Sequence, residues 1–403
     1  MPDQASRNGW TRVTFGDVVR QVRDHVNPGD SGLQRYVAGE HMDTDDLRIR
    51  RWGVVGDGYL GPAFHMRFRP GQVLYGSRRT YLRKVAVAEF EGITANTTFV
   101  LEPKDPNVLL PDLLPFVMQT EPFHEHSIKQ SKGSVNPYVN FSDLTWYEFA
   151  LPPLEEQRRI ALAFKSASLA IDAMMCAKEA GDQARKAFMF ALFQRGTRAE
   201  AQRSTPVGPA PRSWDVVPLG DRYEVQLGKM MSDAARRGSG QVPYIRNANV
   251  QWNRLDLDDV ATMSLSERER AKFALRTGDI LACEGRHVGK SALWRDEIPG
   301  ACYQKALHRL RRRSDRDVPE YLLHCLQYYS WAGRFVAETG ETTIPHLPAE
   351  RLRAMLFPFP PGAEQEEIAS AIRTYDKGLC ALSRRVEQGR RTLVGLNRLF
   401  AAK

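Results

Sequence analysis

Two periodicities of apolar and polar residues alternate along the chain. Residues 1–150 and 213–358 contain short apolar runs between Gly and Pro, such as QVLYG, VAVAEF and TTFVLEP, which are typical of strands joined by turns. Residues 151–195 and 359–403 instead place apolar residues in alternating steps of four and three, as in the seam of a coiled coil. The pattern predicts two globular segments, each followed by a long helix.

The two predicted helices share one register. Their expected seam residues are Ile160, Phe164, Ile171, Met174, Phe188 and Leu192 in the first helix, and Ile368, Ile372, Leu379, Leu382, Leu396 and Phe400 in the second. Each helix alone would serve to cover the core of its own globular segment, but the common register favours pairing between the helices. Residues 196–212 are polar and rich in Pro, Gly and Ser, and we expect a flexible linker that lets the pair run antiparallel.

The chain is an internal duplication. GWTRVTFGDVV, from Gly9, is echoed by SWDVVPLGDRY, from Ser213; LPPLEEQRRIA, from Leu151, is echoed by FPPGAEQEEIA, from Phe359. The tryptophans are separated by 214 − 10 = 204 residues and the glutamines by 365 − 157 = 208. Such a long period indicates a repeated domain, because solenoid repeats are far shorter.

Composition narrows the functional classes. The chain of 403 residues has 57 Lys and Arg against 48 Asp and Glu, a net charge of +9, which favours a polyanionic partner such as nucleic acid. Five scattered cysteines without a C-x-x-C pair indicate reduced thiols. The N-terminus lacks an apolar signal segment, and the longest apolar stretch, residues 187–193, is too short to span a bilayer. We expect a cytoplasmic protein without a membrane partner.

Together, the repeated GW…GD starts, the two PP..EQ helix entrances and the VGKSALW segment from Val288 resemble the DNA-specificity subunits of type I restriction-modification systems. The resemblance covers nearly the whole chain. It implies an α+β fold with two tandem, pseudo-symmetric target-recognition domains at 1–150 and 213–358, spacer helices at 151–195 and 359–403, and an antiparallel coiled coil. It also implies a non-catalytic protein that reads a two-part target in double-stranded DNA and positions two methyltransferase subunits, with motor-nuclease subunits as further partners.

Candidate DNA-binding residues are the Arg, Lys, Asn, His and Tyr side chains of Gly-containing loops, since Arg suits guanine and Asn suits adenine. In the first half they are Arg78, Arg79, Tyr81, Arg83, Lys84, Lys132, Asn136 and Tyr138. In the second half they are Arg246, Asn247, Asn249, Arg286, His287, Lys290 and Lys305. Any one of these could equally be a solvated surface side chain.

Several motifs invite a catalytic or cofactor interpretation. Gly56, Gly58 and Gly61 match a dinucleotide fingerprint, but Pro62 and a strand-like run follow them where a phosphate-binding helix would begin. Asn136-Pro-Tyr lacks a proline of the methyltransferase box, and Cys283, His287, Cys302 and His308 lack a zinc knuckle. We expect no catalytic residues, no metal and no cofactor. A coiled-coil scaffold and a fused modification enzyme without recognisable catalytic motifs remain the alternatives.

Overall fold

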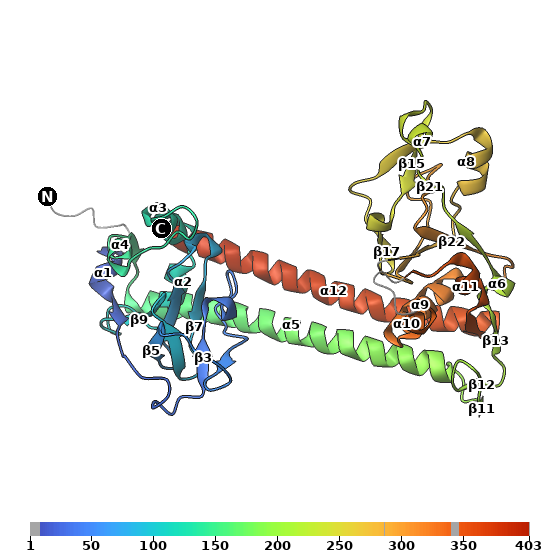
Figure 1. Ribbon diagram of the computed structural model, residues 1–403. Helices are drawn as coiled ribbons and strands as arrows, with labels where there is room; N and C mark the ends of the chain where they lie inside the picture. The colour runs from blue at the N-terminus through green and yellow to red at the C-terminus, as the bar shows by residue number, and fades with distance from the viewer. Residues whose placement is uncertain (1–8, 286, 340–345, 403) are drawn as a thin grey trace. The chain divides into compact units, whose positions relative to one another are not determined.

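The computed structural model describes residues 9–285, 287–339 and 346–402 (Figure 1). The chain divides into two units: unit 1 comprises residues 1–176 and 383–403, and unit 2 comprises residues 177–382. Two long helices, α5 (Leu154–Arg195) and α12 (Gly362–Ala401), each contribute one part to each unit. The remainder of each unit is a mixed α/β globular part.

The globular part of unit 1 contains two four-stranded sheets, with strand orders β2-β9-β6-β7 and β4-β3-β8-β5, and a separate strand pair β1-β10. The strands are β1 (Thr11–Thr14), β2 (Val19–Val22), β3 (Arg35–Val37), β4 (Gly53–Val54), β5 (Phe64–Phe68), β6 (Val73–Gly76), β7 (Val85–Val87), β8 (Gly92–Ala95), β9 (Thr98–Pro103) and β10 (Glu148–Leu151). The short helices are α1 (Phe15–Val18), η1 (Gly39–His41), η2 (Thr80–Leu82), α2 (Leu114–Met118), α3 (Glu121–Gln130) and α4 (Phe141–Leu144). The expected strand after Pro62 is β5.

Unit 2 repeats this plan. Its four-stranded sheet has the order β14-β22-β19-β20, its smaller sheets are β18-β15-β21 and β16-β17, and β13 pairs with β23 as β1 pairs with β10. The strands are β13 (Asp215–Pro218), β14 (Tyr223–Leu227), β15 (Gln241–Ile245), β16 (Val250–Gln251), β17 (Arg254–Leu255), β18 (Ala261–Ser264), β19 (Ile280–Cys283), β20 (Ser291–Leu293), β21 (Cys302–Tyr303), β22 (Leu307–Arg312) and β23 (Leu356–Phe359). The short helices are α6 (Leu219–Arg222), α7 (Asp233–Arg237), η3 (Asn247–Asn249), α8 (Glu267–Phe273), α9 (Pro319–Trp331), α10 (Arg334–Thr339) and α11 (Ala349–Ala354).

The repeated sequence motifs attach each globular part to the start of a long helix. In unit 1, the indole Nε1 of Trp10 donates a hydrogen bond to Glu156, at 2.9 Å. In unit 2, the indole Nε1 of Trp214 donates to Glu364, at 3.1 Å. In both units the glutamine that follows donates to the carbonyl of the first proline of the Pro-Pro pair, Gln157 to Pro152 and Gln365 to Pro360. The motifs that support the family resemblance therefore have a structural role.

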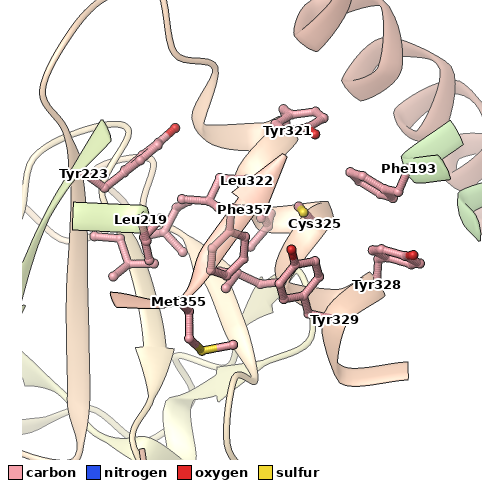
Figure 2. Packing of buried hydrophobic residues seen from close by; sticks show 14 of the residues in the cluster. Phe193, Leu219, Tyr223, Tyr321, Leu322, Cys325, Tyr328, Tyr329, Met355 and Phe357 are labelled. Atoms are coloured by element: carbon pink, nitrogen blue, oxygen red, sulfur yellow. The ribbon is translucent and has the colours of Figure 1, made fainter. Parts of the chain in front are cut away.

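Aromatic residues fill the core of unit 2 between α9 and β23 (Figure 2). Tyr329 stacks on Phe357 with ring centroids 4.4 Å apart. The hydroxyls of Tyr321 and Tyr329 donate to the carbonyls of Pro358 and Leu356, both at 2.7 Å. Burying a tyrosine adds hydrophobic stabilisation without a desolvation penalty only when its hydroxyl is bonded in this way.

The two long helices contact one another in both units. In unit 2, Phe188 stacks on Tyr375 and the Tyr375 hydroxyl donates to the carbonyl of Gly181 at 3.0 Å. In unit 1, Phe164 meets Phe400, with centroids 6.3 Å apart, and the space beside Gly389 is occupied by Ile171. All twelve expected seam residues are buried or half-buried, and several of them, such as Phe164 on Phe116, also pack against the globular part of their unit.

Residues 196–212 are ordered, and the expectation of a flexible linker is wrong. They form a hairpin of β11 (Gln202–Arg203) and β12 (Ala210–Pro211), closed by Thr205 and Gly208, which exchange backbone hydrogen bonds. The guanidinium of Arg334 donates to the carbonyl of Val207, and Arg203 donates to the carbonyl of Trp214 at 2.8 Å. These bonds fasten the hairpin to unit 2, a tertiary effect that composition does not reveal.

Among the described residues, α5 alone is long and apolar enough, by length and composition, to cross a membrane. Its most apolar 18-residue window has a mean hydropathy of 1.5. This window is longer than the uninterrupted apolar stretch at residues 187–193, because it also includes polar residues. Charged residues of this helix bond to the globular part of unit 1: Asp172 accepts from Arg48 at 2.8 Å, and Lys165 lies 3.6 Å from Asp112. The first half of α5 is therefore a packing element of unit 1.

Candidate nucleic-acid interface

Two candidate loops of unit 1 meet, and we call residues 77–84 and 131–139 the first loop pair. Lys132 and Tyr138 exchange backbone hydrogen bonds of 2.8 and 2.9 Å, which closes the turn that carries Asn136. The amide of Arg79 donates to the carbonyl of Pro137 at 2.6 Å, and the amide of Val139 donates to the carbonyl of Ser77. Arg78, Arg79, Lys132, Asn136 and Tyr138 are thus brought onto one surface.

The side chains of the first loop pair differ in their availability. Arg78 lies over the Tyr138 ring at 5.8 Å from its centroid, and Tyr81, Tyr138 and Asn136 are exposed. Lys132 is also exposed, and its ammonium donates to both carboxylate oxygens of Asp143 at 3.1 Å. Arg79 has a positive φ of 50° and makes no ion pair with the described residues. A left-handed conformation is uncommon for a residue with a side chain and is often found at functional sites. The exposed cations and rings provide the groups that contact phosphates and stack on bases.

Arg83 and Lys84 are half-buried and have partners within unit 1. The guanidinium of Arg83 pairs with Glu121, and the ammonium of Lys84 donates to the carbonyl of Gly39. Burial, followed by the nearby Arg79 guanidinium, lowers the pKa of Lys84. Both residues fix the end of the loop to its neighbours.

The candidate residues of unit 2 also gather from several segments. Asn247 donates to the carbonyl of Gly285 at 3.4 Å, and the Lys290 ammonium lies 3.4 Å from the side-chain oxygen of Gln251. The amide of Glu284 donates to the carbonyl of Ala306, which places Lys305 close by. His287 and Lys305 are exposed, whereas Arg286 lies outside the described residues. We call residues 246–254, 284–285, 287–290 and 304–306 the second loop group.

Asn249 and Arg246 are engaged within the second loop group. Asn249 is 3% exposed; its side-chain nitrogen donates to the carbonyls of Asp256 and Asp259, at 2.8 and 2.9 Å, and its side-chain oxygen accepts from the amide of Arg246. The Arg246 guanidinium pairs with Asp259 at 2.6 Å. Asn249 therefore organises the loop, and its amide is not available to a base in this conformation.

Arg254 belongs to the same surface but was not among the candidates. It is exposed on β17, opposite Gln251 of β16, and the turn between these strands contains Asn253 with a φ of 59°. The signal in the sequence was the Trp-Asn-Arg stretch at residues 252–254, three residues after the candidate Asn249, because it is a tight turn with a basic residue at its exit.

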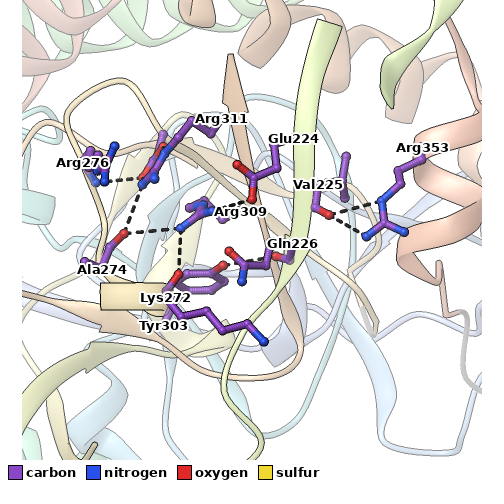
Figure 3. A network of polar contacts seen from close by, with 11 residues as sticks. Glu224, Val225, Gln226, Lys272, Ala274, Arg276, Tyr303, Arg309, Arg311 and Arg353 are labelled. Atoms are coloured by element: carbon purple, nitrogen blue, oxygen red, sulfur yellow. Dashed lines mark hydrogen bonds and ion pairs between the residues drawn. The ribbon is translucent and has the colours of Figure 1, made fainter. Parts of the chain in front are cut away.

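Other basic residues of unit 2 form ion pairs and hydrogen bonds inside the unit (Figure 3). Arg309 of β22 pairs with Glu224 at 3.0 Å and donates to the carbonyls of Lys272 and Ala274. Arg311 binds both carboxylate oxygens of buried Asp279, at 2.7 and 2.6 Å. A count of positive charge therefore overstates the number of cations that can meet a phosphate.

The cysteine and histidine candidates lie in structural environments. Burial raises the pKa of the Cys283 thiol to about 12 and that of Cys302 to about 11, so both stay protonated at neutral pH. His308 is buried, and its Nε2 is 2.8 Å from the carbonyl oxygen of Leu347. Within residues 9–285, 287–339 and 346–402, no group of three or more His, Cys, Asp or Glu side chains is arranged to hold a metal ion.

Comparison with known proteins connects this architecture to a family. The specificity subunit of the type I restriction enzyme MjaVIII of Methanocaldococcus jannaschii is 24% identical over 294 residues, which cover 71% of this chain and 68% of that protein. A solved structure concerning complex assembly and conformational transition of the type I R-M system has a TM-score of 0.62 at 21% identity, covering 100% of this chain and 97% of that one. The type I restriction-modification S subunit of M. genitalium has a TM-score of 0.59 at 13% identity, covering 99% and 98%.

The family model described as the type I restriction modification DNA specificity domain matches residues 66–174 and 211–388. These ranges contain parts of both globular segments and both long helices, including the first loop pair and the second loop group. The chain belongs to the type I restriction-modification DNA specificity family, whose members recognise DNA sequence.

Proposed function

We propose that the chain is a non-catalytic subunit that reads a bipartite DNA target, one part with each globular segment. The repeated architecture carries this proposal. Both units have the same strand order in their four-stranded sheets, and in both a basic loop leaves the third strand of that order, β6 in unit 1 and β19 in unit 2. Two copies of one DNA-binding domain favour a target with two recognised DNA segments over one continuous recognition site.

The loops at these equivalent positions are fixed by equivalent bridges. In unit 1, Arg78 bridges to Tyr138; in unit 2, Gly285 bridges to His346. Arginine and asparagine on such loops can form paired hydrogen bonds with guanine and adenine, whereas lysine contributes mainly to phosphate affinity. Arg78, Arg79, Asn136 and Asn247 are our base-reading candidates, and Lys132, Lys290 and Lys305 are our phosphate candidates.

We further propose that α5 and α12 pair as an antiparallel coiled coil that sets the length of the unread spacer. Residue numbers support the direction: in unit 2, Gly181 lies against Leu379 and Phe188 against Tyr375, so one number rises as the other falls. In unit 1, Phe164 meets Phe400 and Ile171 lies beside Gly389. A helix of 42 residues measures about 60 Å at 1.5 Å per residue, which exceeds one turn of DNA.

An ion pair within unit 2 supports a fixed register for this pairing. The Arg185 guanidinium binds both carboxylate oxygens of Asp376, one of them at 2.9 Å, and donates to Gln327 at 3.1 Å. A bidentate pair is satisfied at one alignment only, and sliding either helix by a turn would leave a half-buried charge without its partner. Arg185, three residues before the seam residue Phe188, thus has a complementary partner on the other helix.

The proposed partners are double-stranded DNA and two methyltransferase subunits, with motor-nuclease subunits as further components. Co-expression with a methyltransferase subunit followed by native mass spectrometry tests the assembly, and binding to DNA panels tests the reading. We expect a complex with two methyltransferase copies that prefers one bipartite sequence. A complex limited to one copy, or with equal affinity for unrelated DNAs, would contradict the proposal.

A further inference from the structure

One exposed arginine of unit 1 stands apart from the loops considered above. Eight arginines of its globular part form ion pairs with carboxylates: Arg12, Arg20, Arg48, Arg50, Arg51, Arg67, Arg69 and Arg83. Arg35 lies over the rings of Trp52 and Phe90, and Arg78 lies over Tyr138. Arg23, directly after β2, is exposed and makes no ion pair or hydrogen bond within the described residues.

Arg23 lines an open cleft of about 720 Å³ in unit 1. Polar side chains of Gln21 and Asn96 share its walls with Arg23, and aromatic rings of Phe99 and Phe141 contribute apolar surface. The side chains of Gln21 and Asn96 also have no hydrogen-bond partner in the described part of the chain. The cleft thus presents a guanidinium and two carboxamides whose hydrogen-bonding groups are not used within the unit.

The cleft adjoins the first loop pair. Ser77 accepts a hydrogen bond from the amide of Val139, and its own amide donates to the carbonyl of Thr97, at 3.0 Å in both cases. Asn96 and Asn140, which are the chain neighbours of Thr97 and Val139, line the cleft. The cleft and the first loop pair are therefore joined through adjacent residues.

Unit 2 takes a different course at the corresponding place. After β14, which matches β2 in the strand order, Lys229 pairs with Glu269. The amide of Lys229 donates to the carbonyl of Tyr303, and its carbonyl accepts from the amide of Lys305. A side chain at Gly228 would collide with the backbone of Gln304. In unit 1 the chain after β2 instead runs beside β5, where His25 stacks on His65. The two units therefore differ in structure after β2 and β14, as is expected of two domains that recognise different DNA sequences.

We propose that this cleft reads two base pairs of the first part of the target, with Arg23 binding the guanine edge of one and Asn96 the adenine edge of the other. The proposal rests on the proposed function. Arginine donates two hydrogen bonds to the O6 and N7 atoms of guanine, and asparagine both donates and accepts at the N6 and N7 atoms of adenine. The neutral carboxamides and aromatic walls favour a base edge over a phosphate as the occupant.

The test uses the chain assembled with its methyltransferase subunits and a panel of single-base DNA variants. Arg23→Ala and Asn96→Ala are each expected to lower discrimination at one position of one half-target, by about 5- to 150-fold. Arg23→Lys should retain most of the affinity and lose the same discrimination, because an ammonium cannot bind two acceptors of guanine as a guanidinium does. Arg20→Ala is the matched control, since Arg20 lies on β2 and pairs with Glu102 at 2.6 Å.

Three results would overturn the proposal. Wild-type discrimination at every position in both alanine variants would show that the cleft is not read. Equal weakening of all sequences by Arg23→Ala, with a shallower salt dependence, would identify a phosphate contact. Relaxed discrimination in Arg20→Ala as well would show a general effect on unit 1. Each of these requires that the wild-type complex discriminates; if it does not, the proposed function itself is wrong.

Discussion

At the scale of single residues, the structure separates cations that organise the fold from cations that can meet DNA. Arg309 and Arg311 are bonded to Glu224 and Asp279 inside unit 2, whereas Arg78 and Arg79 have no carboxylate partner in the described part of unit 1. The basic loops were predictable from the sequence, because Arg, Lys and Tyr residues cluster around Gly in the amino-acid sequence. It could not show that Asn249 is buried, since that depends on the carbonyls of residues distant from it in the loop.

The first loop pair gives a prediction that separates base contacts from phosphate contacts. Arg79→Ala in the assembled complex should relax preference at one position of one half-target, by about 1–3 kcal/mol of discrimination. Lys132→Ala should instead weaken all sequences similarly and make the salt dependence shallower. Binding to single-base variants at several salt concentrations measures both effects. Arg12→Ala, which removes an exposed arginine paired with Glu148, is the control and should change neither; unchanged base preference in Arg79→Ala would contradict its assignment.

Two buried histidines predict a loss of stability in acid. Burial lowers the pKa of His124 and of His324 to about 4, and none of their ring nitrogens has a hydrogen-bond partner in the described part of the chain. Because both titrate near 6.5 when unfolded, the unfolded chain binds more protons between pH 4 and 6.5. Their contribution is present above pH 6.5 and is lost as the pH falls toward 4, at most about 3 kcal/mol each.

Thermal unfolding followed by circular dichroism between pH 4 and 7 tests this dependence. His324→Leu should flatten the fall in stability over that range whatever its effect at neutral pH, because the variant has no proton to bind there. His287→Ala, at an exposed position, should leave the slope unchanged. An unaltered slope in His324→Leu would show that other groups govern acid unfolding.

At the scale of elements, the long helices were predictable and the hairpin between the globular parts was not. The heptads and the Pro-Pro pairs mark where α5 and α12 lie, because apolar spacing and helix-breaking residues are properties of the local sequence. Residues 196–212 have the composition of a coil, yet Arg334 and the β11-β12 pairing hold them against unit 2. The cleft of unit 1 was also invisible in the sequence, because its walls come from four segments between residues 21 and 145.

Glycines of the helix pair in unit 2 supply a test with an internal control. A Cβ at Gly181 would lie 2.6 Å from Leu379, whereas nothing lies within 4 Å of a Cβ at Gly378. Gly378→Leu should stabilise the chain by about 0.5–1 kcal/mol, because glycine is a poor helix former. Gly181→Leu should destabilise it by about 1–3 kcal/mol, since the added side chain has no space.

Melting temperatures of the two full-length variants decide this prediction. We expect Gly378→Leu above the wild type and Gly181→Leu below it. Equal stabilisation by both substitutions would mean that α5 and α12 do not pack closely at this point in solution.

At the scale of the whole molecule, the duplication predicts independent reading. Each globular part has its own tryptophan anchor, Trp10 or Trp214, and its own four-stranded sheet. Replacing residues 1–150 by the same region of a relative should therefore change one part of the methylated sequence and preserve the other. Methylation mapping of cells that carry the hybrid measures this, and simultaneous change of both parts would refute independent reading.

Single-molecule sequencing of the methylated motif, in a host that expresses the chain with its methyltransferase subunit, tests the central claim most directly. We expect one motif with two specific parts and an unread spacer, and we expect this motif to disappear when the chain is deleted. Deletion should abolish both parts together, because both are read by one polypeptide. A continuous motif without a spacer, or methylation that persists without the chain, would contradict the assignment of a bipartite DNA reader.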